Sequence, residues 1–597
     1  NNMCGISGIF NFSKKIINVK TIVKNFVDHQ KKRGPDFNSI WESEDKLICF
    51  GHNRLSIIDL SVNANQPFIS NDKNYIITFN GEIYNHLELR KHLQSKKVKF
   101  NTDHSDSEVV LNGLDSEGIK FIEKLRGQFA IFYLNRKNKK IYIARDRLGQ
   151  KPLYYKLENK EIFFSSNLKS LTFLTQDKSV DLDSITEYLN LGIVRSPNTI
   201  FKNIKKVKPA ELIEIDFSEE NFSINKKIYW NPREFIDNQK FNNEEFFDLF
   251  SESVEIRSNA DVEIANFLSG GLDSTSIVKS LFDKKNKQIN TFSVGFESSK
   301  YDESQWSKKV ADKFRTNHYQ LNIGQNELNE HILDSISSLD EPYADPSILP
   351  SYLLSKHISS KYKVAISGDG GDELLGGYSR TSQALLKDEN IFSLLSNLYH
   401  LYPSFLGTGN FFLKQSKELG IRYSSFLEDR KLLKLLKIKS DSKNNLNVDI
   451  DNENFYKSLL LSDYNFFLPE MMMFKIDRTS MANSLEIRSP FVDHKLVEYV
   501  LSHSTEYVNL EKPKAIFQEY LVGDFGKEFI SRKKQGFVFD TKEWVYGNIK
   551  EIKNQFQDSQ NLFRGPKTIY NLSINKSRIN SLRIWKLFVL DTYLNNI

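Results

Sequence analysis

The stretch Asn266-Phe-Leu-Ser-Gly-Gly-Leu-Asp-Ser-Thr-Ser-Ile277 predicts a strand, a glycine loop and a helix in succession. Residues 262–268 have the composition of a buried strand, residues 269–274 that of a loop, and a helix can start at Thr275. Gly270 and Gly271 can turn their backbone N–H groups toward an anion, and the Ser269 and Ser274 hydroxyls add further donors. The stretch therefore predicts a phosphate-binding loop, of neither the GxxxxGK[ST] nor the GxGxxG type.

The acidic residue of this loop, Asp273, needs a separate explanation. A carboxylate beside a phosphate repels it unless a cation lies between them, so we assign Asp273 to Mg²⁺ bound to ATP phosphates. The string SGGLDS resembles the pyrophosphate loop of enzymes that split ATP into AMP and pyrophosphate. The plainer alternative is a glycine-rich turn with a structural role alone.

Length and composition indicate a folded protein with two large domains. At 597 residues the chain is longer than one hydrophobic core usually serves. The net charge of +6 is spread without a long basic block, so we expect no nucleic-acid partner. Two cysteines, Cys4 and Cys49, exclude a disulfide framework and favour a reducing, cytoplasmic location. No apolar run approaches the ~20 residues that span a bilayer, and we expect no membrane attachment.

The second part of the chain alternates predicted strands and helices. Polar, Asn- and Lys-rich sequence over residues 216–241 predicts a linker between a first domain at 1–215 and a second at 242–597. In the second domain we expect strands at 263–268, 289–296, 318–323 and 362–366, and helices at 275–281, 303–314, 328–338 and 349–359. This alternation predicts an open parallel sheet covered by helices, with ligands at the carboxyl ends of its strands.

The stretch Met3-Cys4-Gly-Ile-Ser-Gly-Ile-Phe10 places a cysteine beside what looks like an initiator methionine. If Met3 is removed, Cys4 becomes the N-terminus, and its α-amino group, with an unperturbed pKa of about 8, can accept the thiol proton. Nucleophile and base would then belong to one residue. Asn1 and Asn2 precede Met3 here and would block that amino group. Taken alone, a near-terminal cysteine is more often a small buried hydrophobe.

Further motifs follow at loop-like positions: RGPD at 33–36, HNRLSIID at 52–59, FNGEIYN at 79–85, SDSE at 105–108 and RDRLGQKPLYY at 145–155. With Cys4 they resemble the glutaminase domain of class II amidotransferases, an N-terminal-nucleophile fold with two stacked sheets between helices. The resemblance covers roughly residues 4–210. It implies that Asn80 and Gly81 form an oxyanion hole. It also implies that Arg54 holds the α-carboxylate of glutamine, and that Glu82 and Asp106 hold its ammonium group. For each residue alone, a surface ion pair or a turn is the plainer alternative.

Charged clusters recur in the second domain. Ser367-Gly-Asp-Gly-Gly-Asp-Glu373 follows a predicted strand and lacks the ligand spacing of an EF-hand, so we predict a share in a Mg-nucleotide site. Residues 475–494, KIDRTSMANSLEIRSPFVDH, mix charge into an otherwise helical segment, for which a solvated helix face is the plainer alternative. Arg532-Lys-Lys-Gln-Gly-Phe537 offers cations to a leaving pyrophosphate, although a lone basic run is usually a surface patch.

The strings SGGLDS, EPYADPS, SGDGGDE, DRTSMANSLEIRSPFVDH and KKQGF, in this order over residues 240–545, resemble the synthetase domain of glutamine-hydrolysing asparagine synthetases. The resemblance implies that ATP adenylates aspartate and that ammonia travels through an internal tunnel from the glutaminase to the acyl-adenylate. It assigns Mg²⁺ to Asp273 and Asp372, and a phosphate contact to Lys533. It places the nucleotide at Leu268, Ser269, Gly270, Gly271, Asp273, Ser274, Val294, Ser367 and Gly368.

Two points stay open in the sequence. Many asparagine synthetases have SGEG where this chain has Ser367-Gly-Asp-Gly370; the glutamate there handles the proton of the attacking ammonia, and Asp369 has a shorter reach. SGDGGDE, MANSLEIRSPF and KKQGF are similar to a branch met among surface-polysaccharide enzymes, so a uronic acid on a sugar nucleotide is the alternative acceptor. The roles of Glu486 and Arg488 are open between the acyl-substrate pocket and a buried pair.

We therefore expect an ATP- and Mg²⁺-dependent amidotransferase that takes nitrogen from glutamine, with Cys4 as nucleophile, Asp369 at the amination step and aspartate as acceptor. A glutaminase with a degenerate ATP domain is disfavoured, because Asp273, Asp372 and Lys533 are all present. A non-catalytic sensor of glutamine and ATP is the alternative that AMP release would exclude. A homodimer is left open as the assembly.

Overall fold

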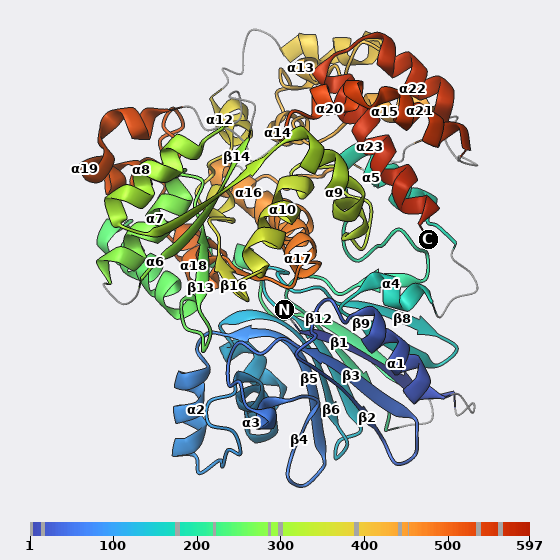
Figure 1. Cartoon of the computed structure of the whole chain (residues 1–597), viewed down its shortest axis with the longest axis vertical. Coiled ribbons are helices and arrows are strands. Elements are labelled where there is room, and N and C mark those ends of the chain that lie inside the picture. Colours follow the sequence, from blue (N-terminus) through green and yellow to red (C-terminus); the bar gives the residue numbers. More distant parts are fainter. Residues whose placement is uncertain are drawn as a thin grey trace.

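The computed structural model describes residues 4–13, 18–173, 179–218, 222–284, 288–296, 302–386, 393–439, 445–451, 453–532, 539–558 and 565–596. Figure 1 shows an N-terminal region, blue to teal, below a C-terminal region, green to red. The N-terminal region is built on two antiparallel sheets, and the C-terminal region on one parallel sheet. Each region supplies one of the predicted sites.

The N-terminal region contains two six-stranded sheets, here called sheets A and B. Sheet A has the order β10 (Ile204–Lys206), β8 (Tyr154–Glu158), β9 (Glu161–Ser165), β1 (Gly5–Asn11), β3 (Ile48–Arg54) and β2 (Phe37–Glu42). Sheet B has the order β12 (Ser223–Ile228), β11 (Glu211–Asp216), β7 (Lys140–Arg145), β6 (Gly127–Asn135), β5 (Tyr75–Ile83) and β4 (Phe68–Ile69).

The two sheets pack face to face over a shared apolar layer. Phe50 of sheet A meets Phe132 of sheet B with ring centroids 4.7 Å apart, and Ile6 and Ile143 belong to the same buried cluster. Sheet A is covered on its outer face by α1 (Val19–His29) and α4 (Leu168–Thr172), whereas α5 (Leu182–Leu191) packs against α15 (Arg430–Leu436) of the C-terminal region. Sheet B is covered by α2 (His86–Ser95) and α3 (Asp106–Glu117). This helix–sheet–sheet–helix arrangement confirms the predicted N-terminal-nucleophile fold.

One strand lies where we predicted a linker. Residues 223–228 form β12, which pairs antiparallel with β11 along its whole length. Its residues are exposed, as expected for an edge strand with a polar sequence, and that polarity made residues 216–241 resemble a linker. Residues 223–228 therefore belong to sheet B.

The C-terminal region is organised by sheet C, whose order is β15 (Asn317–Ile323), β14 (Asn290–Phe296), β13 (Ile264–Phe267), β16 (Val364–Ile366) and β17 (Glu486–Arg488). All four pairings are parallel, as predicted from the alternation of strands and helices. One face packs on α6 (Asn243–Arg257) and α7 (Leu272–Asp283), and the other on α9 (Gln325–Ser337), α10 (Ile348–Ser359) and α17 (Phe474–Met481).

The strand order of sheet C reverses between β13 and β16. Chain segments leave these neighbouring strands in opposite directions, which opens a crevice at their carboxyl ends. The loop after β13 is the predicted phosphate loop, and the loop after β16 is SGDGGDE. The two predicted halves of the Mg-nucleotide site therefore meet.

The predicted helix over residues 475–494 is partly wrong. Glu486–Arg488 form the edge strand β17, between α17 and α18 (His494–Ser502). Three fully buried residues are too short a segment for hydrophobic periodicity to separate a strand from a helix. This strand carries the two residues whose roles the sequence left open.

The remaining helices complete the C-terminal region: α8 (Ser304–Phe314), α11 (Gly371–Leu374), α12 (Ser379–Leu385), α13 (Asn410–Leu413), α14 (Leu419–Ser424), α15 (Arg430–Leu436), α16 (Phe455–Ser462), α19 (Ala515–Ser531), α20 (Thr541–Gly547), α21 (Ile549–Asp558), α22 (Gly565–Ile574) and α23 (Arg578–Asn595). Of the helices in the described ranges, none combines the length and apolar character needed to cross a bilayer.

Buried ion pairs join the two regions. Arg33 makes two bonds to Asp477, 3.0 and 3.1 Å long, and Arg126 lies 2.9 Å from Asp493. Lys206 lies 2.7 Å from Glu341. All these side chains are nearly inaccessible to water, so each charge depends on its partner across the contact. The regions are held in one defined orientation by these pairs.

Candidate active sites

A pocket at the edge of sheet A gathers the residues predicted to bind glutamine. Cys4, which directly precedes β1, lines this pocket together with Arg54, Gly81, Glu82 and Asp106. They come from β1, β3, β5 and α3, elements that are far apart in the sequence. We call this the Cys4 pocket.

The Cys4 thiol is held in a buried environment. Its sulfur donates a long hydrogen bond, 3.9 Å, to the carbonyl oxygen of Leu55. Burial raises the pKa of the Cys4 thiol to about 12, and the Leu55 bond and the Arg54 charge offset only part of that effect. The thiol is therefore protonated at neutral pH, and its use as a nucleophile requires a base that removes the proton at the moment of attack.

Asn80 and Gly81, the predicted oxyanion hole, lie on β5 beside the pocket. The Asn80 amide nitrogen donates to the Ser166 hydroxyl over 3.3 Å, which fixes the direction of the side chain. A Cβ at position 81 would lie 2.0 Å from the Gln128 carbonyl oxygen, so β5 and β6 can pair here only with glycine. Strand pairing therefore fixes Gly81 at the pocket, while the Asn80 amide is buried and donates to Ser166, and the oxyanion-hole role of the two residues stays a prediction.

Arg54 at the end of β3 organises the loop that covers the pocket. Its guanidinium donates to the carbonyl oxygens of Ser61 (2.8 Å) and Asp59 and to the Asn65 side chain (2.7 Å). These bonds fold residues 58–65 around the arginine. A carboxylate that enters the pocket would meet a guanidinium already held in place.

Carboxylates gather at the opposite wall of the pocket. Asp106, the first residue of α3, accepts a bond from the backbone N–H of Ile83 over 3.2 Å. Burial raises the pKa values of both Glu82 and Asp106. The nearby Arg488 opposes this effect at Glu82, whereas the charge of Asp106 adds to it. Such a pair is stabilised by a positive charge placed between them. The wall therefore suits the ammonium group of an amino acid.

A third acid of this pocket comes from the C-terminal region. Glu486 of β17 lines the Cys4 pocket. Arg488, two residues further on, lies 2.7 Å from Glu486 and 3.1 Å from Glu82, and it is fully buried. Glu486 and Arg488 thus form a buried pair, and Arg488 also contacts Glu82 of β5. Without an alignment, the sequence carried no signal that these residues face the other region.

The predicted phosphate loop lies between β13 and α7. The helix begins at Leu272, three residues before the predicted start, so Asp273 and Ser274 belong to its first turn. Gly270 has φ = +75°, and a Cβ there would lie 2.7 Å from the backbone nitrogen of Ser307. The Ser269 and Ser274 hydroxyls are 3.2 Å apart across the turn. The free N–H groups of a helix N-terminus are therefore available for an anion.

The SGDGGDE loop packs directly against this helix. A Cβ at Gly371 would lie 2.6 Å from an Asp273 carboxylate oxygen, and one at Gly368 would lie 3.0 Å from the Asp273 Cβ. Glycine at both positions lets the two loops approach closely. Asp273 and Asp372 consequently face a common space, as the assignment to one metal requires.

That space is bridged by a residue that we had not singled out. Lys514 Nζ lies 2.6 Å from both Asp273 carboxylate oxygens and 2.6 Å from Asp372. Lys514 has φ = +59°, an unfavourable backbone conformation for a residue with a side chain, and it directly precedes α19. A charge held between two acids in strained backbone indicates a functional position. The sequence EKPKAI gave no motif from which to find it.

The two carboxylates fit a magnesium ion that is shared with phosphates. Among the described residues, no three His, Cys, Asp or Glu side chains form a site that would hold a metal alone. Mg²⁺ commonly uses one or two carboxylates, with waters and substrate phosphates as its other ligands. Asp273 and Asp372 therefore suit Mg²⁺ that arrives with a nucleotide.

Other predicted residues surround this loop. Leu268 continues from β13 and donates its backbone N–H to Phe292 of β14 over 2.8 Å, and Val294 lies further along β14. Arg532 donates to the Gly270 carbonyl oxygen and stacks on Trp306 at 4.7 Å. Lys533 lies outside the described residues. The basic run thus reaches the loop through Arg532.

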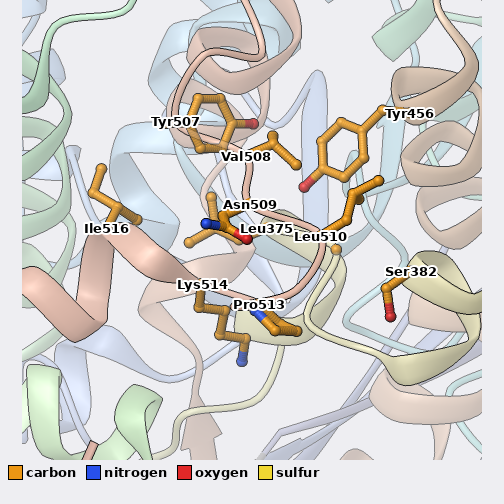
Figure 2. A pocket seen from close by; sticks show the side chains of 11 residues that line it. Leu375, Ser382, Tyr456, Tyr507, Val508, Asn509, Leu510, Pro513, Lys514 and Ile516 are labelled. Atoms are coloured by element: carbon orange, nitrogen blue, oxygen red, sulfur yellow. The ribbon is translucent and has the colours of Figure 1, made fainter. Parts of the chain in front are cut away.

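A second pocket lies beside Lys514, the residue that pairs with Asp273 and Asp372. It is lined by Leu375, Gly376, Tyr456, Tyr507, Leu510 and Lys514. Figure 2 shows Tyr456 and Tyr507 on the side opposite Lys514. Asp369, half-buried in the SGDGGDE loop, lies three residues before Asp372. The predicted site residues of the C-terminal region that are described therefore lie around the switch point of sheet C.

Comparisons with known proteins agree with this arrangement. The chain matches the family model described as asparagine synthase over residues 245–580, and that of the glutamine amidotransferase domain over residues 3–230. It is similar to asparagine synthetase (glutamine-hydrolyzing) 1 of Bacillus subtilis, with 31% identity over 94% of this chain and 90% of the relative. It is also similar to asparagine synthetase (glutamine-hydrolyzing) 3 of the same organism, with 30% identity over 90% of this chain and 87% of the relative.

Proposed function

The chain belongs to the asparagine synthase family, and from that premise we propose that it is a glutamine-hydrolysing ligase that uses ATP to convert a carboxylate, aspartate, into its amide. One observation carries the proposal. Strand β17 touches both sites: Glu486 lines the Cys4 pocket, and the Arg488 carbonyl oxygen accepts the N–H of Ser367, the first residue of the SGDGGDE loop, over 3.0 Å. One short strand thus joins a glutaminase pocket to a nucleotide site.

In the Cys4 pocket, glutamine binds with its ammonium group at Glu82 and Asp106 and its α-carboxylate at Arg54. The Cys4 thiol loses its proton to a base and attacks the side-chain amide carbon. Asn80 and the Gly81 N–H stabilise the oxyanion, ammonia leaves, and water hydrolyses the thioester to glutamate. If Cys4 is the mature N-terminus, its own α-amino group is that base.

In the C-terminal site, the phosphate loop holds the β- and γ-phosphates at the N-terminus of α7. Bound Mg²⁺ would neutralise phosphate charge between Asp273 and Asp372. Lys514, whose amino group lies 2.6 Å from Asp273 and from Asp372, would then turn from these carboxylates to the phosphates. The acceptor carboxylate attacks the α-phosphate, and pyrophosphate leaves. Ammonia attacks the resulting acyl-adenylate and releases AMP.

Aspartate is the acceptor that the relatives favour. Two relatives matched over most of their length are named asparagine synthetases, and neither name points to a uronic acid. We assign to Asp369 the proton from the attacking ammonia, because Asp369 lies in the loop that also carries Asp372. Its short side chain requires the acyl-adenylate to lie close to the loop.

The test is a product assay with the full chain, glutamine, ATP, Mg²⁺ and either aspartate, glucuronic acid or galacturonic acid. We expect AMP and asparagine in equal amounts with aspartate, and no AMP above background with either uronic acid. ADP in place of AMP would contradict the assignment of the phosphate loop. AMP with a uronic acid and none with aspartate would contradict the acceptor.

A further inference from the structure

The loop after β3 forms one wall of the Cys4 pocket. Leu55, Ile57 and Ile58 of this loop line the pocket, and residues 55–65 are here called the lid. Within the N-terminal region the lid is held by the guanidinium of Arg54. A second attachment joins the lid to the C-terminal region, and a single residue, Asp261, makes it.

Asp261 lies three residues before β13, the strand that leads into the phosphate loop. Its backbone N–H donates to the Ile57 carbonyl oxygen over 3.1 Å. Its carboxylate accepts the backbone N–H of Asp59 over 2.7 Å. The Asp261 carboxylate is therefore an anchor for the lid, provided that another group keeps this carboxylate in position.

His104 is the group that holds the anchor. It precedes α3, and the two residues after it, Ser105 and Asp106, line the Cys4 pocket. The Nε2 atom of His104 lies 2.6 Å from the same Asp261 oxygen that anchors the lid, and the Nδ1 atom lies 2.9 Å from Asp103. The lid and the start of α3, two walls of one pocket, thus meet at one residue of the C-terminal region.

The geometry selects one charge state of His104. Both ring nitrogens face carboxylates, and an ionised carboxylate accepts hydrogen bonds but cannot donate them. A neutral imidazole has one N–H and can serve only one of these carboxylates, whereas the imidazolium cation serves both. Burial alone would lower the pKa of His104, but the bonds to Asp261 and Asp103 outweigh burial and raise the pKa above its ordinary value of 6.5.

Further titratable groups lie around the His104 ring. Asp59 of the lid adds a negative charge that favours the cation. Arg90 of α2 offsets part of the negative charge, since it interacts with Asp59 and Asp103. His86 of α2 also interacts with His104, but burial lowers the pKa of His86, and its ring is neutral at pH 7. The carboxylates therefore decide the charge of His104.

We propose that His104 is a positioning residue that, as a cation, holds the lid of the Cys4 pocket through Asp261, so that glutamine binds most tightly when His104 is protonated. No covalent step is involved. The proposal rests on the proposed function only in taking glutamine as the ligand of the Cys4 pocket. Because the cation is the holding form, its effect is complete below the ordinary His pKa of 6.5 and is lost as the pH rises through the raised pKa of His104.

The test is the pH dependence of glutamine binding by the full chain between pH 5.5 and pH 8.5. The KM for glutamine is taken from glutamate release, and the Kd from calorimetry on the Cys4→Ala chain, which cannot turn glutamine over. We expect both constants to rise at least about threefold across this range when His104 is present. His104→Gln keeps a donor but cannot be charged, so its KM and Kd should equal the native values at pH 8.5 and should not vary with pH.

Two further substitutions make the test specific. Asp261→Asn removes the charge that His104 binds and keeps an acceptor for the lid, so it should weaken glutamine binding at pH 5.5 as much as His104→Gln does. The double variant should be no weaker than either single variant, because both act on one pair. The side chains of His104 and Asp261 are 30% and 35% exposed, so these changes leave the core intact.

His92→Gln is the matched control. His92 lies on α2 with its Nε2 atom 2.7 Å from Glu117, and neither residue lines the Cys4 pocket. This variant should keep the native KM and its pH dependence. The rate at saturating glutamine should follow the same course with pH in all chains that retain Cys4, because the lid affects binding and not the attack.

A glutamine affinity that varies with pH alike in the native chain and in His104→Gln would overturn the proposal, and so would additive losses in the double variant. A native chain that binds glutamine with the expected pH dependence but forms no AMP with aspartate would overturn the proposed function and support the role of His104. A chain that neither binds nor hydrolyses glutamine would overturn both.

Discussion

The two sites differ in what holds their residues. In the Cys4 pocket, Arg54 and Gly81 are on strands of the two antiparallel sheets, and Asp106 accepts the backbone N–H of Ile83, which is on the same strand as Gly81. In the C-terminal site, Asp273 and Asp372 are in first helical turns after loops, and Lys514 lies between them. The first site is ready for a ligand that carries both charges of an amino acid. In the second site, the Lys514 ammonium group lies between the two carboxylates, in the space that a bound Mg²⁺ and phosphate would need.

This difference has an electrostatic cause. An amino acid carries both an ammonium group and a carboxylate. The acidic side chains and Arg54 can therefore both keep their positions in the pocket before the ligand binds. A magnesium-nucleotide brings a strong cation and strong anions, and two bare carboxylates close together would repel each other without a cation. Lys514 supplies that cation. On the proposed function, the C-terminal site would rearrange when a magnesium-nucleotide binds, and the Cys4 pocket would not need to rearrange for glutamine.

The largest expected effect separates the sites completely. Cys4→Ala should lower glutamine-dependent synthesis by at least about 10⁴-fold, because no other group can form the thioester. Ammonia-dependent synthesis should stay near the native rate. Glutamate release and amide formation, measured in parallel with glutamine and with ammonium chloride, check this. A variant that still hydrolyses glutamine would contradict the role of Cys4.

A large effect on the C-terminal site, with the Cys4 pocket unaffected, is expected from a substitution at Lys514. Lys514→Met keeps the length of the side chain but removes the cation, and AMP formation should fall on the order of 10²-fold. Glutamine hydrolysis should remain. Lys512→Met, an exposed lysine two residues away, is the matched control and should retain AMP formation. If both variants form AMP at the native rate, Lys514 is only a structural counter-ion.

An intermediate effect is expected at Asp369. Asp369→Asn should still form the acyl-adenylate but should slow amide formation by about 10-fold to 10²-fold, because the proton acceptor is lost. AMP would then exceed amide as the intermediate hydrolyses. Asp369→Glu should crowd the acceptor and slow the reaction less. Equal loss of AMP and amide in Asp369→Asn would assign the residue to the loop or the metal.

The smallest effect on turnover, with a clear effect on stability, is expected at the contact between the regions. Burial alone would raise the pKa of Asp493, but the Arg257 and Arg126 guanidinium groups hold it well below its usual range. Because the pKa is depressed, the stabilisation is present above the ordinary Asp pKa of 3.8 and is lost as the pH falls below it.

Asp493→Asn should therefore lower the free energy of unfolding at pH 7 by about 3 kcal/mol, and by less near pH 3. Glu214→Gln breaks a partly exposed pair with Lys140 and is the control, with an expected change below about 1 kcal/mol. Chemical denaturation at both pH values checks the difference. A loss that is equal at pH 7 and pH 3 would argue against the charge as its cause.

Sequence and structure agree best where motifs and periodicity are strong. The strands β13 to β16 of sheet C, and Cys4, Arg54, Gly81, Glu82 and Asp106 of the Cys4 pocket, were predictable because each lies in a motif or a buried run. β12 was missed because an exposed edge strand has no apolar alternation, and β17 because three residues carry no period. Lys514 was missed for a different reason: one lysine in an unremarkable stretch becomes visible only when folding brings it to Asp273.

We propose that the two sites serve one reaction and are joined across β17. The direct measurement gives the full chain [amide-¹⁵N]glutamine, ATP, Mg²⁺ and aspartate in the presence of excess unlabelled ammonium. The account predicts that the asparagine amide keeps most of the ¹⁵N and forms in step with AMP. An amide whose label falls to that of the ammonium in solution would contradict it.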